Sequence, residues 1–263
     1  MTGPGSAPPR LSVILPCYAG AELARHSAET LIRFFGETGV SWELLVVDDG
    51  GNDFAEHPLP AHPGIRLLRH ERNLGKGAAV RTGMLAASGQ VRIYTDIDLP
   101  YDLDLLLALE RHVQRGFHLA VGDRTLPGAS FVAPRTRARQ VLSSVASAFI
   151  GSLVTGGYYD TQCGIKAFRG DVAAELFRLV TISGFAFDVE VIYLAQKHRL
   201  DIKRVPVQLR RDDSSSVRIL RDSLQGVIDI LGIKVRQLQG RYGSPFLEQL
   251  IAAEAQAART PSR

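Results

Sequence analysis

Two aspartates stand two residues apart in the segment Thr95-Asp96-Ile97-Asp98, which closes a short apolar run. In an extended strand, residues i and i+2 point to the same face, so both carboxylates can bind one cation. Carboxylate oxygens suit Mg²⁺ or Mn²⁺, and such an ion keeps open positions for the oxygens of a diphosphate. Asp96 and Asp98 are therefore predicted metal ligands. The alternative is a solvated turn or a helix N-cap before Leu103.

A second acidic segment follows another apolar run, at Val46-Val47-Asp48-Asp49-Gly50-Gly51. A carboxylate here can accept hydrogen bonds from a base N–H or a ribose hydroxyl, and the glycines let the backbone approach a ligand. We predict that Asp48, Asp49 and Gly50 belong to a nucleotide site, with a plain strand-to-loop turn as the alternative.

A third run ends in Leu15-Pro16-Cys17-Tyr18, where Tyr18 can stack on a nucleobase or can simply be a half-buried aromatic. The segment Arg72-Asn73-Leu74-Gly75-Lys76-Gly77 places glycines and a lysine at a predicted helix start, which is a natural phosphate site. It lacks the Walker A spacing. A glycine-rich N-cap with exposed basic residues is the alternative.

These segments need a scaffold that brings strand ends together. Short β-branched runs alternate with helical patterns, which predicts an open, mostly parallel α/β sheet flanked by helices. The carboxyl ends of its strands meet at one edge, where such folds bind ligands. The predicted strands are 11–15, 43–47, 65–69, 91–95, 118–121 and 202–207, and a further short strand follows a turn around 158–164. The predicted helices are 22–35, 76–87, 103–115, 171–179, 187–198 and 217–238.

The chain of 263 residues is predicted to hold one domain. We divide it into a flexible tail at 1–10, a domain at 11–240 and a C-terminal tail at 241–263. The domain has a nucleotide-sugar half at 11–121, an acceptor half at 122–216 and an amphipathic helix at 217–240.

A net charge of +4 is too mild for a nucleic-acid partner but suits anionic substrates or an anionic membrane surface. Two cysteines without CxxC spacing and the lack of a signal-peptide pattern favour the cytosol. A peripheral contact at the inner face of the membrane, a membrane partner and a homo-oligomer all stay open. The uncharged stretch 141–159 carries many Ser, Thr and Gly residues, which favours a soluble or interfacial helix over a membrane span.

In their order and spacing, these segments resemble the inverting glycosyltransferases of family 2. The nearest resemblance is to polyprenyl-phosphate sugar synthases, especially dolichyl-phosphate glucosyltransferases and, more distantly, dolichol-phosphate mannose synthases. It covers roughly residues 11–236. Its most specific stretches are 72–77 with 80–84, Asp160-Thr161-Gln162-Cys163-Gly164-Ile165-Lys166, Phe185-Ala186-Phe187-Asp188-Val189-Glu190 and 221–225.

The resemblance implies a GT-A type fold, with Rossmann-like strands in the nucleotide half, and a set of residue roles. Pro16, Tyr18 and Asp48 would hold the nucleotide, and Asp96 and Asp98 the metal diphosphate. Arg124, in Gly122-Asp123-Arg124, would face the acceptor phosphate, and a second arginine would come from Arg135, Arg137 or Arg139. The implied catalytic set is Asp98, Arg124, Asp160, Gln162 and Asp188. Asp188 and Glu190 can instead pair with basic groups at a helix start.

Three departures from the family pattern matter. Ala19 and Gly20 follow Tyr18 in place of an Asn-Glu pair, and Pro100 stands where a third metal ligand is often found. The loop before the last helix has three serines at 214–216 in place of Gly-Ser-Lys, which leaves Arg211 and Arg218 as the nearest cations for a phosphate.

The predicted activity is transfer of a hexose from a nucleotide diphosphate sugar to a polyprenyl phosphate. UDP-glucose is favoured as donor and GDP-mannose comes next. The alternatives are the same chemistry on a soluble acceptor, and a noncatalytic module that binds a nucleotide sugar or a lipid phosphate. The final helix repeats apolar residues from Val217 to Leu238. We favour packing of this face on the core or on a second subunit over contact with a membrane.

Overall fold

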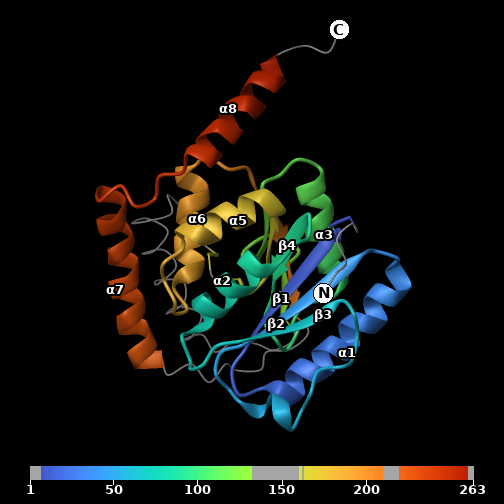
Figure 1. Cartoon of the computed structure of the whole chain (residues 1–263). Coiled ribbons are helices and arrows are strands. Elements are labelled where there is room, and N and C mark those ends of the chain that lie inside the picture. The colour runs from blue at the N-terminus through green and yellow to red at the C-terminus, as the bar shows by residue number, and fades with distance from the viewer. Residues whose placement is uncertain (1–6, 132–159, 162, 210–218, 260–263) are drawn as a thin grey trace.

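A single open sheet of seven strands organises the chain (Figure 1). The computed structural model describes residues 7–131, 160–161, 163–209 and 219–259. The strand order is β3-β2-β1-β4-β7-β5-β8. The strands are β1 (Leu11–Cys17), β2 (Trp42–Asp48), β3 (Ile65–Arg69), β4 (Val91–Tyr94), β5 (Leu119–Asp123), β7 (Lys166–Arg169) and β8 (Ile202–Pro206).

All neighbouring strands pair in parallel except at β7, which runs antiparallel between β4 and β5. The central strands β1 and β2 are buried along nearly their whole length, as near-continuous apolar runs in parallel sheets are. The predicted mostly parallel sheet is confirmed. The carboxyl ends of β1, β2, β4 and β5 therefore lie at one edge, and this places the acidic segments together.

Helices cover both faces of the sheet (Figure 1). On one face, α2, α5 and α6 pack on the sheet and are joined by residues of α7 and α8, whereas α1 and α3 cover the other face. The helices are α1 (Ala21–Thr38), α2 (Lys76–Ala86), α3 (Asp104–Gln114), α5 (Gly170–Leu179), α6 (Phe187–Lys197), α7 (Ile219–Leu238) and α8 (Pro245–Arg259).

Three short elements were not predicted from the sequence. The 3-10 helix η1 (Asp53–Ala55) follows β2, and β6 (Ser130–Phe131) pairs in parallel with β9 (Gln208–Leu209). Each is too short to show a periodic pattern.

Described residues within both predicted tails contact the rest of the domain. Arg10 lies at the end of the predicted flexible tail, yet its Nε is 2.6 Å from Glu110 Oε1 on α3. At the other end, Tyr242 and Leu247 are fully buried in the core. Glu254 on α8 also contacts His118 Nε2 at 2.8 Å. The segment 241–263 thus contains a docked helix.

The apolar face of α7 was predicted to pack on the core or on a second subunit; packing on the core is wrong for the described part of that face, and a second subunit stays a prediction. Leu231, Val235 and Leu238 are exposed, and Ile228 extends the same stripe. The core is instead contacted by residues of the opposite face, Ile230 and Ile233. Because 3.6 residues make one turn, a helix can carry two apolar stripes, and the sequence does not say which one faces inward.

Within the described residues, no helix combines the length and the apolar character that crossing a membrane requires.

Candidate active site

The loop after β2 is built around two buried carboxylates with different partners. Asp48 accepts a hydrogen bond from the backbone N–H of Gly51 at 2.7 Å. Asp49 accepts hydrogen bonds from the backbone N–H groups of Leu74 and Gly75, at 2.9 and 2.8 Å, and contacts His70 Nδ1 at 2.6 Å. Both oxygens of Asp49 are therefore directed into the protein. We assign this residue, predicted as a nucleotide ligand, to holding the glycine loop.

Two tight turns shape the loops that follow β1 and β2. Gly50 has φ of +83°, and a Cβ there would lie 2.5 Å from the backbone of Arg72, so only glycine fits this approach of two loops. Ala19 also has a positive φ, of 48°, which is an uncommon and strained conformation for a residue with a Cβ. Beside it, Tyr18 is 60% exposed, so its ring is available for stacking at the edge of the sheet. Pro16 is half-buried in β1.

The acidic pair lies on the turn after β4, with a lysine against it. Lys76, the first residue of α2, places Nζ 2.5 Å from Asp96 Oδ1. Burial opposes the charge of this ammonium, but attraction from Asp96 and Asp188 and the hydrogen bond to Asp96 outweigh it, so the pKa of Lys76 is raised. Asp98 is half-buried and adds to this field. The sequence predicted a phosphate role for Lys76 but not its pairing with Asp96.

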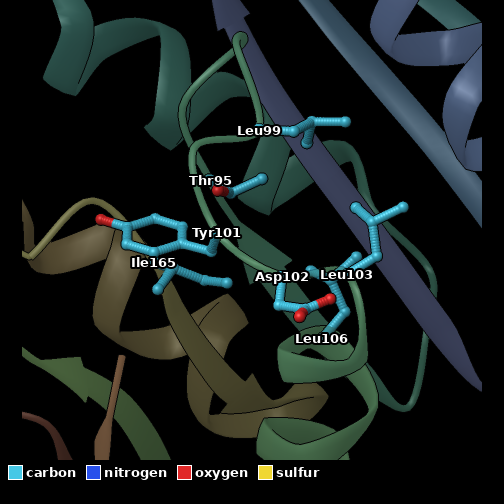
Figure 2. Close-up of a pocket in the computed structure, with 7 residues that line it drawn as sticks. All are labelled: Thr95, Leu99, Tyr101, Asp102, Leu103, Leu106 and Ile165. Carbon is cyan, nitrogen blue, oxygen red and sulfur yellow. The ribbon is translucent and has the colours of Figure 1, made fainter. Parts of the chain in front are cut away.

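A small, mostly apolar pocket lies behind this turn (Figure 2). The buried hydroxyl of Thr95 has no hydrogen-bond partner in the described part of the chain. Leu99 has φ of +45° and closes the turn through a 3.1 Å hydrogen bond from its N–H to Asp96 O. We assign the pocket to support of the acidic turn. Its lining residues are Thr95, Leu99, Tyr101, Asp102, Leu103, Leu106 and Ile165.

Arg124 follows β5 and forms an ion pair with Asp160. Its Nη2 lies 2.7 Å from Asp160 Oδ1, while its Nε and backbone N–H donate to Oδ2 at 3.0 and 2.6 Å. Burial alone would raise the pKa of Asp160, but the hydrogen bonds and charge of Arg124 lower it below its usual range. The carboxylate therefore fixes the direction of the guanidinium. The sequence predicted both residues, and the structure brings them together.

The segment 160–166 connects this arginine to the acidic pair. Four residues after Asp160, Gly164 packs against the Asp96 carboxylate so closely that a Cβ on it would lie 2.9 Å from Cγ and nearer still to Oδ2. Tyr101 accepts a 3.0 Å hydrogen bond from the Gly164 N–H. The role of Gly164 was not predicted, because the sequence does not show which side chain a glycine allows to approach.

Asp188, which the resemblance places in the catalytic set, is buried. Its carboxylate is buried, accepts a 2.5 Å hydrogen bond from the Tyr94 hydroxyl and pairs with the fully buried ammonium of Lys166. Burial and the charge of Asp188 hold the pKa of Tyr94 well above its ordinary value. The alternative that Asp188 pairs with a basic group matches this geometry. The contacts of Tyr94 and Lys166 with Asp188 were not predicted; in the sequence, the tyrosine belongs to an apolar strand pattern.

Glu190, two residues after Asp188 on α6, holds a neighbouring loop. It accepts hydrogen bonds from the Thr181 and Ile182 N–H groups at 2.9 and 2.8 Å and from the Tyr242 hydroxyl. The same loop packs on the glycine segment, because a Cβ on Gly77 would lie 2.5 Å from Ile182 O. Glu190 thus supports the backbone that carries Lys76.

The acidic pair offers the kind of donor atoms that a hard divalent cation takes. No group of three or more His, Cys, Asp or Glu residues that could hold a metal is found in the described residues. Asp96 and Asp98 both supply carboxylate oxygens, so a cation held by these two residues would need its other ligands from elsewhere. Six predicted site residues lie outside the described residues: Arg135, Arg137, Arg139, Gln162, Arg211 and Arg218.

Comparison with known proteins places the chain in a family. The family model described as glycosyl transferase family 2 matches residues 12–177. The dolichyl-phosphate beta-glucosyltransferase of Dictyostelium discoideum is 30% identical over 88% of this chain and 75% of its own length. The enzymes of the same name from Drosophila melanogaster and Saccharomyces cerevisiae are 30% and 26% identical to this chain. Each match covers 88% of this chain and 76% of the relative's own length.

Solved structures show the same fold at low identity. Glucosyl-3-phosphoglycerate synthase of M. tuberculosis superposes with a TM-score of 0.61 at 21% identity, over 86% of this chain and 80% of its own. Mannosyl-3-phosphoglycerate synthase of Rubrobacter xylanophilus superposes with a TM-score of 0.61 at 16% identity, over 90% of this chain and 77% of its own. The GT-A fold expected from the resemblance is confirmed. The chain belongs to glycosyl transferase family 2 and is a glycosyltransferase.

Proposed function

We propose that this glycosyltransferase moves glucose from a nucleotide diphosphate sugar to a polyprenyl phosphate, with UDP-glucose the first donor to test and GDP-mannose the second. The names of the relatives, which match over about three quarters of their length, support the sugar and the acceptor. The exposed ring of Tyr18 beside the buried Asp48 supports a nucleotide at the ends of β1 and β2.

The observation that carries the proposal is the link made by the segment 160–166. Through Asp160 it fixes Arg124, and through Gly164 it touches Asp96. An arginine suited to a phosphate is thus held at the same sheet edge as a carboxylate pair suited to a metal diphosphate. A phosphate acceptor and a diphosphate donor need this arrangement, because the two reacting groups must meet in line.

The donor end would be held by the acidic pair and by the start of α2. Asp96 and Asp98 would bind a Mg²⁺ or Mn²⁺ ion, which supplies charge neutralisation for the departing nucleotide diphosphate. Lys76, at the N-terminus of α2, would bind the same phosphate oxygens, since the helix dipole favours an anion there.

The transfer itself needs no strong general base. A phosphate monoester is anionic near neutral pH, so one of its oxygens can form the bond to the anomeric carbon directly. The bond from that carbon to the donor diphosphate breaks at the same time, and the nucleotide diphosphate leaves with the electron pair. One displacement inverts the configuration. Arg124, oriented by Asp160, would hold the attacking phosphate.

The exposed stripe of α7 fits peripheral contact with the bilayer that carries a lipid acceptor. It consists of Ile228, Leu231, Val235 and Leu238. The helix lies close to the donor site, since a Cβ on Gly184 would be 3.8 Å from Asp229 on α7. Gly184 adjoins Phe185, which is half exposed and near Lys76. A helix on the membrane surface buries such an apolar face among the lipids.

The activity is tested by transfer of labelled sugar from UDP-glucose or GDP-mannose to a short polyprenyl phosphate with Mn²⁺. We expect a labelled lipid with UDP-glucose, and loss of most of the product with Asp98→Asn. No product with either donor would refute the proposal. A product on 3-phosphoglycerate, with none on the lipid, would move the acceptor to a water-soluble phosphate.

Membrane contact is tested by flotation with phosphatidylcholine and phosphatidylglycerol vesicles. The double variant Val235→Gln with Leu238→Gln should lower the bound fraction at least about fivefold, because it removes apolar area from the stripe. Leu23→Gln, at a partly exposed position on α1, is the matched control. Equal flotation of all forms would contradict this surface, as would a dimer in sedimentation that the double variant dissociates.

A further inference from the structure

The ammonium of Lys76 and a divalent cation would compete for one carboxylate. Lys76 Nζ lies 2.5 Å from Asp96 Oδ1, and the two side chains are 22% and 33% exposed. Metal–oxygen bonds are short, so a divalent ion on that oxygen would come within about 5 Å of the ammonium. Partial burial keeps water from screening such a repulsion fully. The ion pair therefore opposes binding of the metal by itself.

The backbone around Lys76 cannot relieve this conflict. Asp49 holds the preceding residues through the N–H groups of Leu74 and Gly75. On the other side, Gly77 packs against the backbone of 182–184 so closely that no Cβ fits. The lysine can leave Asp96 only by rotating its four-carbon side chain.

The surroundings of Lys76 limit where the ammonium can go. Asp188, the next carboxylate in its field, already pairs with Lys166. The Phe185 ring lies 5.9 Å from Nζ and covers it on one side. An arriving diphosphate, by contrast, brings new negative charge to the N-terminus of α2, where the lysine begins. Such a diphosphate would take the ammonium from Asp96 without leaving its charge unpaired.

We propose that Lys76 is a resident counter-ion of Asp96, which keeps a free divalent cation weakly bound until a nucleotide diphosphate draws the ammonium onto its phosphate oxygens. Metal and nucleotide then bind with positive coupling, and each raises the affinity of the other by the same factor. This inference rests on the metal and diphosphate site of the proposed function and adds the order in which that site fills.

The test measures binding of Mn²⁺ alone to the whole chain, by the electron paramagnetic resonance of free Mn²⁺ or by calorimetry. Lys76→Met removes the ammonium and keeps the length of the side chain. We expect it to bind Mn²⁺ at least about tenfold more tightly than the wild type. Lys76→Arg should behave as the wild type. Lys197→Met, at an exposed position at the end of α6, is the matched control and should change nothing. Asp96→Asn should abolish the signal in each background.

The same titrations are repeated with saturating UDP or GDP. The nucleotide should tighten Mn²⁺ binding at least about tenfold in the wild type and much less in Lys76→Met. Circular dichroism checks that each variant is folded, and Lys76→Gln serves as a second test of the charge. Equal Mn²⁺ affinity of the wild type and both neutral variants without nucleotide would overturn the proposal.

The outcomes separate this inference from the proposed function. If neither nucleotide binds, the donor assignment fails, while tighter Mn²⁺ binding by Lys76→Met still supports the counter-ion. If UDP binds and labelled lipid forms, but the lysine variants leave the Mn²⁺ affinity unchanged, the proposed function stands and the counter-ion is refuted.

Discussion

Replacement of Gly164 by alanine tests the geometry of the acidic pair most directly. A Cβ at this position would lie 2.9 Å from Asp96 Cγ and closer still to Oδ2, whereas real Cβ contacts under 3.0 Å essentially never occur. Gly164 has no positive φ, so alanine adds no backbone strain. The methyl group must therefore push the carboxylate aside, and we expect a displacement of about 1 Å.

A shift of that size should lower the catalytic rate strongly and the free energy of unfolding only slightly. Misplacement of a reacting or binding group by about 1 Å can reduce the rate on the order of 100-fold, which corresponds to about 2.7 kcal/mol of transition-state stabilisation. The Asp96 side chain is one-third exposed and can swing toward solvent. We therefore expect the free energy of unfolding of Gly164→Ala to fall by less than about 1.5 kcal/mol, the ordinary effect of a point substitution.

The assay compares kcat/KM for sugar transfer, Mn²⁺ binding with UDP and urea unfolding for the wild type and Gly164→Ala. Gly36→Ala on α1 is the matched control, since a Cβ there meets nothing within 4 Å. It should stabilise the fold by about 0.5–1 kcal/mol and leave transfer unchanged, because glycine weakens helix interiors. A folded Gly164→Ala protein with kcat/KM within threefold of the wild type would refute the reasoning.

Three further predictions follow from the ion pairs and hydrogen bonds of individual carboxylates. Asp160→Asn frees Arg124, so in steady-state kinetics the KM for polyprenyl phosphate should rise about tenfold while the KM for the donor stays unchanged. Asp201→Asn, at an exposed position, is the control, and an equal rise of both KM values in Asp160→Asn would contradict the acceptor role of Arg124. Burial would raise the pKa values of Glu43 and Asp160, but hydrogen bonds to their charged forms lower both. The stabilisation that these two carboxylates contribute is thus fully present above their unfolded-state pKa values and is lost as the pH falls through their folded-state pKa values. The urea concentration at the unfolding midpoint should therefore fall as the pH is lowered from about 5, and it should fall less in Glu43→Gln. A midpoint that does not change with pH would argue against this explanation. Glu254→Gln should weaken the docking of α8 by up to about 1 kcal/mol, seen as faster hydrogen exchange confined to 245–259, whereas exchange that rises throughout the core would show a wider role.

Much of the scaffold and the outline of the site could be predicted because their signals are local. Apolar runs such as Leu11–Cys17 have the length and the β-branched content of buried strands, and parallel pairing then brings their carboxyl ends to one edge. The acidic pair, the glycine loop and Arg124 were placed there in this way. The contacts of residues in the predicted tails could not be predicted because they are long-range: 100 residues separate Arg10 from Glu110, and 136 separate His118 from Glu254.

Residue types and short spacings in the sequence predicted the kind of chemistry: carboxylates for a cation, arginine for a phosphate, and glycine and lysine at a helix start. Which of these groups lie together depends on the tertiary structure. It turned Asp49 toward the glycine loop, paired Asp188 with Lys166 and set Lys76 against Asp96. The physical reason is that a carboxylate bonds to the nearest donor in space, and a folded chain makes that donor a residue far away in sequence.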